Sequence, residues 1–299
     1  MFSIQDILYG GLVPAVVAAA VVLVAFWVLP HSLARRYSAA AALALGLFAG
    51  YELLDLGPWL AETHWHWLPY AVLAAAVAGP VACAEGVWLF ERPLLYLVVA
   101  IGAGWFLVPD WEDLQPSRTS YWIGLSIYLV VLTGLMEPLA VRFKGPLLPA
   151  VMWLTMTAAA VVLALSGSMR FAQIGIAAAF ALFAIAVVGG WLADRFVVTG
   201  GVFAFAMAAV GLLMIGRVNS FSDVPMVSYA IVPAAPLALW LTVAGPLSRL
   251  TGAKALAVRI ALPLLVLVIA VAIAVVAESG SSDEYASSGN VLMYAKCSV

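Results

Sequence analysis

Two carboxylates inside a long apolar stretch are the residues best suited to chemistry. Glu52 and Asp55 lie three positions apart, which predicts one shared helix face, and Tyr51 is next to them. A charged side chain within a bilayer is costly unless it faces protein or water, so such residues mark functional positions. Paired carboxylates can hold a cation or share a proton. The pair is therefore a candidate coupling or substrate site; alternatively, Asp55 reaches the interface and Glu52 bonds a neighbouring helix.

A second set of charged residues is expected near the opposite, cytoplasmic side of the membrane. Glu85, Glu137 and Arg259 each lie close to the cytoplasmic end of an apolar run, at similar predicted depth. Because a buried charge needs a partner, the three form a candidate ion-pair cluster that ties the helices together or closes an inner gate. Snorkelling of the long side chains to the interface is the alternative.

Prolines interrupt two of the apolar runs. Gly79 and Pro80 lie in the middle of one run, and Pro233 and Pro236 lie in the middle of another. Proline lacks a backbone donor and clashes with the preceding turn, so both helices are predicted to be kinked or broken at these candidate hinges. Transporters expose backbone groups to substrate at broken helices. Prolines also occur in membrane helices that only bend.

Tryptophans gather near the predicted outer ends of four helices. An amphipathic indole ring fits the headgroup level, which favours an aromatic belt. The segment 62–67 also contains His64 and His66, so an external ligand or partner site is the alternative. The tryptophans concerned are Trp59, Trp65, Trp67, Trp111 and Trp122.

The composition predicts the helices that must position these side chains. Apolar residues make up 66% of the 299 residues, charged residues only 9%, and the mean hydropathy is +1.13. A soluble domain would carry roughly a quarter charged residues. Because the apolar runs are continuous and about 20 residues long, they predict an all-α transmembrane bundle of about ten spans. The runs are 7–29, 38–57, 69–89, 93–109, 120–139, 146–166, 171–191, 199–216, 226–247 and 256–277.

The distribution of basic residues predicts the orientation. If the N-terminus is outside, most of the 13 basic residues fall on one face, and positive charge marks the cytoplasmic side. With ten spans, both termini are then non-cytoplasmic. The expected location is a cell membrane of the bacterial inner-membrane type. The basic residues on the cytoplasmic face would be Arg35, Arg36, Arg92, Arg142, Lys144, Arg195, Arg249, Lys254 and Arg259.

A weak internal repeat suggests how the chain is organised. The sequence of residues 11–16 resembles that of residues 147–151, and each is followed by a helix rich in small residues. A single transmembrane domain, 1–278, would then have halves 1–144 and 145–278. An odd number of spans per half inverts the second copy, as in many secondary transporters. Residues 279–299 are polar and are expected to form an extramembrane tail.

Several chemistries are not supported by the residues present. The 3 histidines, His31, His64 and His66, provide no mid-membrane pair of haem ligands, and no Lys within a span could form a retinal Schiff base. Phosphate-loop, HExxH and GxSxG motifs and zinc-type Cys/His spacing are missing from the sequence. We therefore expect no cofactor or metal, and an enzyme is less favoured. The charge balance, 13 basic against 15 acidic, does not favour nucleic-acid binding.

Two functions fit these observations. The number of helices, the prolines and the carboxylates Glu52 and Asp55 favour a small-solute or ion carrier. The scarcity of buried charge and the many small residues favour a non-catalytic subunit or scaffold of a larger membrane complex. The lipid bilayer is the expected environment. Membrane protein partners, or further copies of the chain, are expected in the second case.

Overall fold

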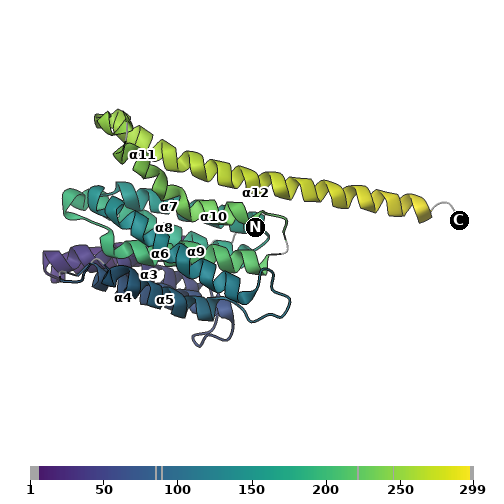
Figure 1. The fold of residues 1–299 in the computed structure, drawn as a ribbon, viewed down its shortest axis with the longest axis horizontal. Coiled ribbons are helices and arrows are strands. Elements are labelled where there is room, and N and C mark those ends of the chain that lie inside the picture. The colour runs from purple at the N-terminus through teal and green to yellow at the C-terminus, as the bar shows by residue number, and fades with distance from the viewer. Residues whose placement is uncertain (1–6, 85, 89, 221, 245, 297–299) are drawn as a thin grey trace.

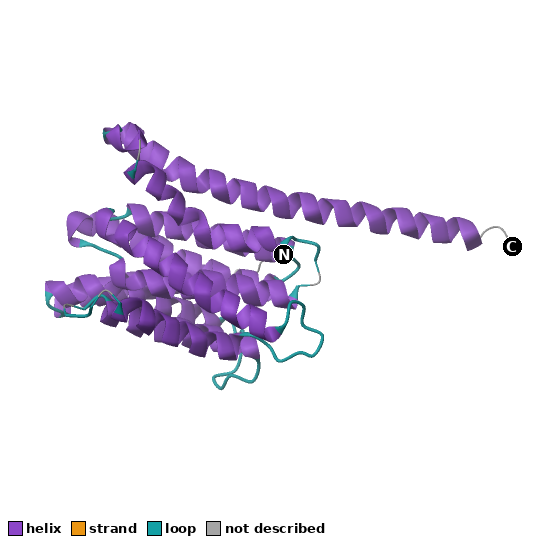
Figure 2. Cartoon of the chain, in the orientation of Figure 1, coloured by secondary structure: helices purple, strands orange, loops and turns teal. Residues whose placement is uncertain are grey.

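A computed structural model of the chain describes residues 7–84, 86–88, 90–220, 222–244 and 246–296, without the side chains of residues 246 and 280–296. The described part of the chain contains helices and loops and no strand, as Figure 2 shows. Each of the ten predicted apolar runs overlaps a helix in the described residues. The α-helices are α2 (Val13–Val28), α3 (His31–Leu53), α4 (Leu68–Ala82), α5 (Glu91–Leu107), α6 (Arg118–Arg142), α7 (Leu147–Leu165), α8 (Met169–Leu192), α9 (Val202–Asn219), α10 (Met226–Ala234), α11 (Trp240–Val243) and α12 (Gly252–Lys296).

Short 3₁₀-helical or π-helical turns adjoin several of these helices. A π-helical turn, η1 (Leu8–Leu12), precedes α2, and 3₁₀ turns occupy η2 (His64–Trp67), η3 (Ala193–Arg195), η4 (Thr199–Gly201), η5 (Ala235–Leu239) and η6 (Pro246–Arg249). Turns of this kind are common at helix ends and at interruptions. The interruption at η5 is the one that bears on the site described below.

Seven helical segments in the described part of the chain are long and apolar enough to cross a bilayer. These segments fit a membrane protein in contact with lipid, but they do not confirm the predicted count of about ten. Helices α4 and α5 have only 15 and 17 residues, and Arg35 and Arg36 make the start of α3 polar. The seven segments are Leu8–Val28, Arg118–Arg142, Leu147–Leu165, Met169–Arg195, Thr199–Asn219, Met226–Val243 and Gly252–Ser279.

Helix α9 forms the centre of the bundle. Its spanning segment is 83% buried and packs against α3, α4, α6, α7, α8 and α10. Alanine and glycine make this close packing possible, because small side chains let helix backbones approach. By contrast, the spanning segments of α2 and α12 are each only 22% buried and lie at the periphery. A substitution in α9 therefore affects more helices than one in α2 or α12.

The packing does not confirm an inverted five-plus-five repeat. Helix α7 packs against α12, and α2 packs against α8. A two-fold repeat would require equivalent packing of α2 against α6, and of α7 against α3, and neither pair is among the main helix contacts of the described residues. The weak sequence similarity between residues 11–16 and 147–151 therefore stays a sequence observation.

Helix α12 extends well beyond the bundle. Its backbone continues as helix to Lys296, where the polar composition of 279–299 predicted an irregular tail, and Figure 1 shows this end projecting past the other helices. Among the side chains of α12 that the structure describes, those of Leu267, Ala270 and Ala274 are buried. Helix α12 packs against α7 and α10.

Candidate ligand-binding site

The predicted coupling residues lie at the end of α3. The helix ends at Leu53, so Asp55 lies in the following turn and does not share a continuous helix face with Glu52. Asp55 is exposed and has a φ of 49°, a left-handed conformation that aspartate tolerates better than most residues. One carboxylate oxygen of Glu52 is buried without a hydrogen-bond partner. Glu52 is thus the stronger of the two candidates for a coupling role.

Tyr51 lies in the last turn of α3, next to a closely packed loop. Its side chain is buried, and its hydroxyl and the His66 ring both lie close to Gly57. His66 Nδ1 accepts hydrogen bonds from the backbone N–H groups of Glu62 and Thr63, both at 3.2 Å. The neutral ring therefore carries its proton on Nε2. This arrangement fixes the loop after α3 onto the bundle.

The predicted outer aromatic cluster makes contacts within the protein. The guanidinium of Arg170 lies 5.1 Å from the centre of the Trp65 ring, and Trp65 packs against Phe171. His64 Nε2 lies 3.0 Å from Asn219 Nδ2, which can donate to it, at the end of α9. Burial, with a smaller effect of the nearby His66, lowers the pKa of His64 to about 4. These contacts join the loop to α8 and α9.

The structure describes two of the three residues of the predicted inner cluster. Glu137 accepts hydrogen bonds from the hydroxyl of Tyr96 and from Cys83 Sγ, the latter at 3.6 Å. The guanidinium of Arg259 lies 5.3 Å from the centre of the Phe143 ring. Glu85 lies outside the described residues. Within the described ranges, Glu137 and Arg259 form no ion pair with each other, and Glu137 is held by neutral donors from α5 and from the residue after α4.

The two predicted hinge regions differ in the structure. Helix α4 is continuous through Gly79 and Pro80, and a Cβ on Gly79 would overlap the carbonyl oxygen of Gly200. Gly79 is thus a position of close backbone packing. The helix that contains Pro233 and Pro236 is interrupted, since α10 gives way to the 3₁₀ turn η5 before α11 begins. Only the second region has the broken geometry that the prolines predicted.

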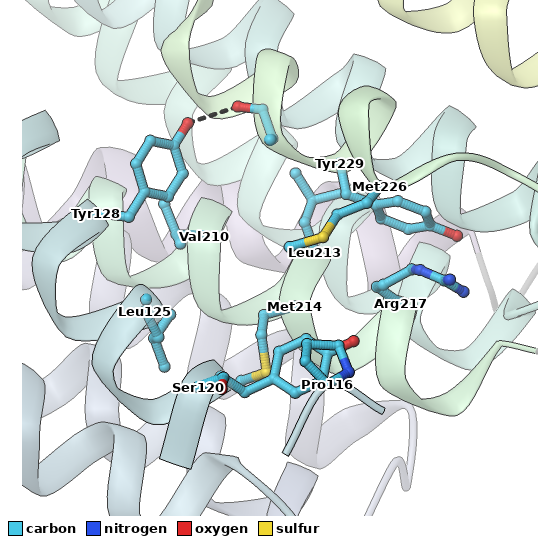
Figure 3. A pocket seen from close by; sticks show the side chains of 13 residues that line it. Pro116, Ser120, Leu125, Tyr128, Val210, Leu213, Met214, Arg217, Met226 and Tyr229 are labelled. Atoms are coloured by element: carbon cyan, nitrogen blue, oxygen red, sulfur yellow. Dashed lines mark hydrogen bonds between the residues drawn. The ribbon is translucent and has the colours of Figure 1, made fainter. Parts of the chain in front are cut away.

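An apolar cavity of about 250 Å³ lies beside this interrupted helix (Figure 3). Helices α6, α9 and α10 form its walls. Most of its lining is aliphatic or sulfur-containing, and Tyr128 donates a 2.6 Å hydrogen bond to the carbonyl of Ala230 at one end. The lining residues are Pro116, Ser120, Tyr121, Gly124, Leu125, Tyr128, Val210, Leu213, Met214, Arg217, Met226, Tyr229 and Ala230.

Two polar groups without partners lie at the other end of the cavity. Tyr229 is only 5% exposed, and its hydroxyl has no hydrogen-bond partner among the described residues. Nε of Arg217 is likewise buried and unpartnered. Figure 3 shows the Tyr229 hydroxyl and the Arg217 guanidinium at the same end of the cavity. Buried polar groups are normally hydrogen-bonded, so two unpartnered groups on residues that line one cavity make it the candidate ligand site.

A second, polar pocket of about 540 Å³ adjoins the apolar cavity. Arg217 and Tyr121 line both, so the two spaces meet at these side chains. The site is thus polar on one side of Arg217 and apolar on the other. The polar pocket is also lined by Trp111, Asp113, Leu114, Gln115, Val218 and Ser220.

The sequence prediction did not single out Arg217, Tyr229 or Tyr128. Arg217 is not among the basic residues expected on the cytoplasmic face, and the sequence assigned no chemistry to it. The prolines at 233 and 236 were the signal that pointed toward this region, because they mark the helix that walls the cavity. The partners of that helix depend on tertiary packing, which a single sequence does not reveal.

Comparisons of the chain with protein-family models, curated proteins and solved structures give no match. Within the described ranges, no group of three or more His, Cys, Asp or Glu side chains is arranged to hold a metal ion. The functional argument therefore depends on the geometry of the cavity and its walls.

Proposed function

We propose that this membrane protein is a carrier of a small solute, and that the cavity between α6, α9 and α10 is its binding site. The observation that carries the proposal is the position of this cavity against a helix interrupted at Pro233 and Pro236. Transporter sites commonly lie at discontinuous helices, whose free backbone groups and altered packing allow a wall to move. In the predicted orientation, with ten spans in a bacterial inner membrane, the site opens near the outer face.

Two side-chain hydrogen bonds hold the interrupted helix against α6. Tyr128 of α6 donates to the carbonyl of Ala230, and Trp240 Nε1 of α11 donates to the carbonyl of Leu135 at 3.0 Å. Each acceptor lies three residues before a proline, Pro233 or Pro138, where a proline ring loosens the helix. A wall held by two such bonds can rearrange without breaking the core around α9.

Glu52 is the proposed coupling residue, with Tyr51 and Asp55 beside it. A buried carboxylate oxygen without a partner can take up a proton or cation. If uptake is driven by an ion gradient, Glu52→Gln should abolish gradient-driven uptake, whereas Asp55→Asn, in the exposed turn, should retain most of it.

Uptake into liposomes containing the purified chain tests the carrier proposal. A panel of radiolabelled solutes, with and without proton and sodium gradients, should reveal saturable uptake that the P233A/P236A double variant reduces at least about tenfold. Pro263→Ala in α12, a helix that does not line the cavity, is the matched control and should transport normally. Equal uptake by both variants, or no uptake of any solute, would contradict the proposal.

The exposed face of α12 favours a second candidate function, a subunit of a larger membrane complex. Most of its spanning segment is unburied, and Leu265, Val268 and Val276 are more than half exposed at 57%, 56% and 69%. Lipid or a partner helix could cover this face. Gentle-detergent purification from native membranes would distinguish the two, because a stoichiometric membrane partner favours the subunit and a lone protein favours the carrier.

A further inference from the structure

We infer that the ligand of this site is an amphiphile with a single acyl-type chain and one anionic head group, an inference that rests on the proposed binding function of the cavity. The apolar chain would occupy the cavity between α6, α9 and α10. The head group would lie beside the guanidinium of Arg217, at the junction with the polar pocket that this side chain also lines. The polar pocket beyond Arg217 would hold the water around the head group.

The apolar lining selects the chain. The aliphatic and sulfur-containing part of the lining comes mainly from α6 and α9, with Leu125, Val210, Leu213 and Met214. An aliphatic chain bound there gains dispersion contacts and buries its apolar surface away from water. The volume of about 250 Å³ is just below the usual range for ligand sites, roughly 300–1,000 Å³. One chain therefore fits better than the two chains of a bilayer phospholipid.

The unpaired charge of Arg217 selects the sign of the head group. Arg118, at the start of α6, is paired with Asp110 at 3.1 Å and lies over the Trp105 ring at 4.8 Å. Arg217 has no such acidic partner among the described residues. A guanidinium binds a carboxylate or phosphate through two parallel hydrogen bonds.

Asp113 limits the charge of the head group. It is the carboxylate that lines the polar pocket, and it would repel a second negative charge placed beyond Arg217. A monoanion is therefore favoured over a dianion.

The exposed rim of the cavity provides a route from the membrane. Met226 is 55% exposed, and Gly124 and Ala230 are also exposed, so the gap between α6 and α10 faces outward from the bundle. A chain can enter sideways between these helices while its head group stays near the outer end. This route suits a molecule that already resides in the lipid.

Binding of radiolabelled dodecanoate to the full chain in zwitterionic nanodiscs tests the inference. We expect saturable binding, at least about tenfold tighter than that of 1-dodecanol, dodecylamine or acetate, because only dodecanoate has both the chain and the anionic head. Arg217→Gln should weaken dodecanoate binding by at least about tenfold, while Arg217→Lys retains part of it. Arg118→Gln removes a cation that is already paired, so it is the matched control and should bind normally.

A second variant fills the cavity without touching the charge. A Cβ on Gly124 would meet no atom within 4 Å, so Gly124→Phe can place its ring in the cavity without a backbone clash. It should abolish dodecanoate binding while the melting temperature stays close to that of the wild type. Equal binding of dodecanol and dodecanoate, or unchanged binding in both Arg217→Gln and Gly124→Phe, would overturn the inference.

The two proposals fail in different ways. Specific dodecanoate binding with no uptake of any solute would support the ligand class and contradict the carrier. Uptake of another class of solute with no dodecanoate binding would support the carrier and overturn the ligand class.

Discussion

The turn after α3 leaves no room for a side chain at residue 57. A Cβ on Gly57 would overlap the Tyr51 hydroxyl and lie 2.7 Å from Cδ2 of His66, and both of these rings are buried. Gly57→Ala should therefore lower the stability by about 2 kcal/mol, because a packed site must shift to admit a methyl group. Thermal unfolding in detergent measures this change as a lower melting temperature.

Gly102→Ala is the control for this prediction. Gly102 lies within α5, and its Cβ would meet nothing within 4 Å. Alanine favours helix over glycine by about 1 kcal/mol, so the control should melt at the same temperature or slightly higher. A Gly57→Ala variant as stable as the wild type would show that the turn is looser than described.

His64 should make the stability fall at acidic pH. Its pKa in the folded protein is about 4, below the ordinary 6.5, because the ring is partly buried. The unfolded state then binds more protons between these values, so stability is fully present above pH 6.5 and is lost as the pH falls toward 4. Protonation also removes the acceptor at Nε2 that faces Asn219.

We expect the free energy of unfolding to fall by about 1 kcal/mol between pH 7 and pH 4.5, after allowing for solvent screening. His64→Gln should flatten the dependence of the melting temperature on pH, whereas His31→Gln, at an exposed position, should leave it unchanged. An equally steep dependence in the His64→Gln protein would assign the effect to another group.

Residue types could be predicted from the sequence better than residue partners. Glu137 was expected to pair with Arg259, yet its carboxylate faces Tyr96 and Cys83. The rotation of each helix about its axis decides such partners, and nearly uniform hydrophobicity gives little information about rotation. The unpaired Arg217 could not be recognised for the same reason.

At the level of elements, hydrophobic runs predicted the helices, and prolines predicted only some of the breaks. Pro80 is a single proline within α4, it removes one backbone donor, and the helix stays continuous. Pro233 and Pro236 are three residues apart, so they remove two donors from adjacent turns and the helix changes to 3₁₀ geometry. The spacing of two prolines thus distinguishes the broken helix from the continuous one.

The two bonds between α6 and the interrupted helix should control its local opening. Tyr128→Phe and Trp240→Phe each remove one donor to a carbonyl of the opposing helix. Each lost hydrogen bond should lower the free energy of local opening by about 1 kcal/mol. Hydrogen–deuterium exchange should then become several-fold faster in 226–243 and remain unchanged in α9.

Trp122→Phe is the matched control for these two variants. Trp122 Nε1 donates to the carbonyl of Ile101 at 2.8 Å, so the same type of bond is lost, but between α5 and α6. Exchange in 226–243 should match the wild type in this control. Unchanged exchange in all three variants would mean that packing alone holds the wall.

For the whole molecule, composition predicted the class but not the arrangement. An apolar fraction of 66% requires a membrane protein with helices that satisfy their own backbone groups. Which helix is central depends on side-chain size, and the small residues of α9 explain its position only once its neighbours are known. The cavity lies between α9 and two helices that contain proline, α6 with Pro138 and α10 with Pro233.

Helix α12 should support the site through its first half only. Ala270 and Ala274 are fully buried at 0% exposure on a helix that packs against α7 and α10. Ala270→Phe should force α12 away from these helices, lower the stability by about 1–3 kcal/mol and weaken dodecanoate binding through the displaced α10.

Leu265→Phe, at a position 57% exposed on the same helix, should change neither property. Truncation after Ser279 should also preserve both, because the packed positions of α12 described above precede residue 279. These predictions are checked by measuring the melting temperature and the dodecanoate binding of all three variants. A truncated chain that unfolds or loses binding would show that the projecting helix contributes to the bundle, and normal binding by Ala270→Phe would show that α10 keeps its position without α12.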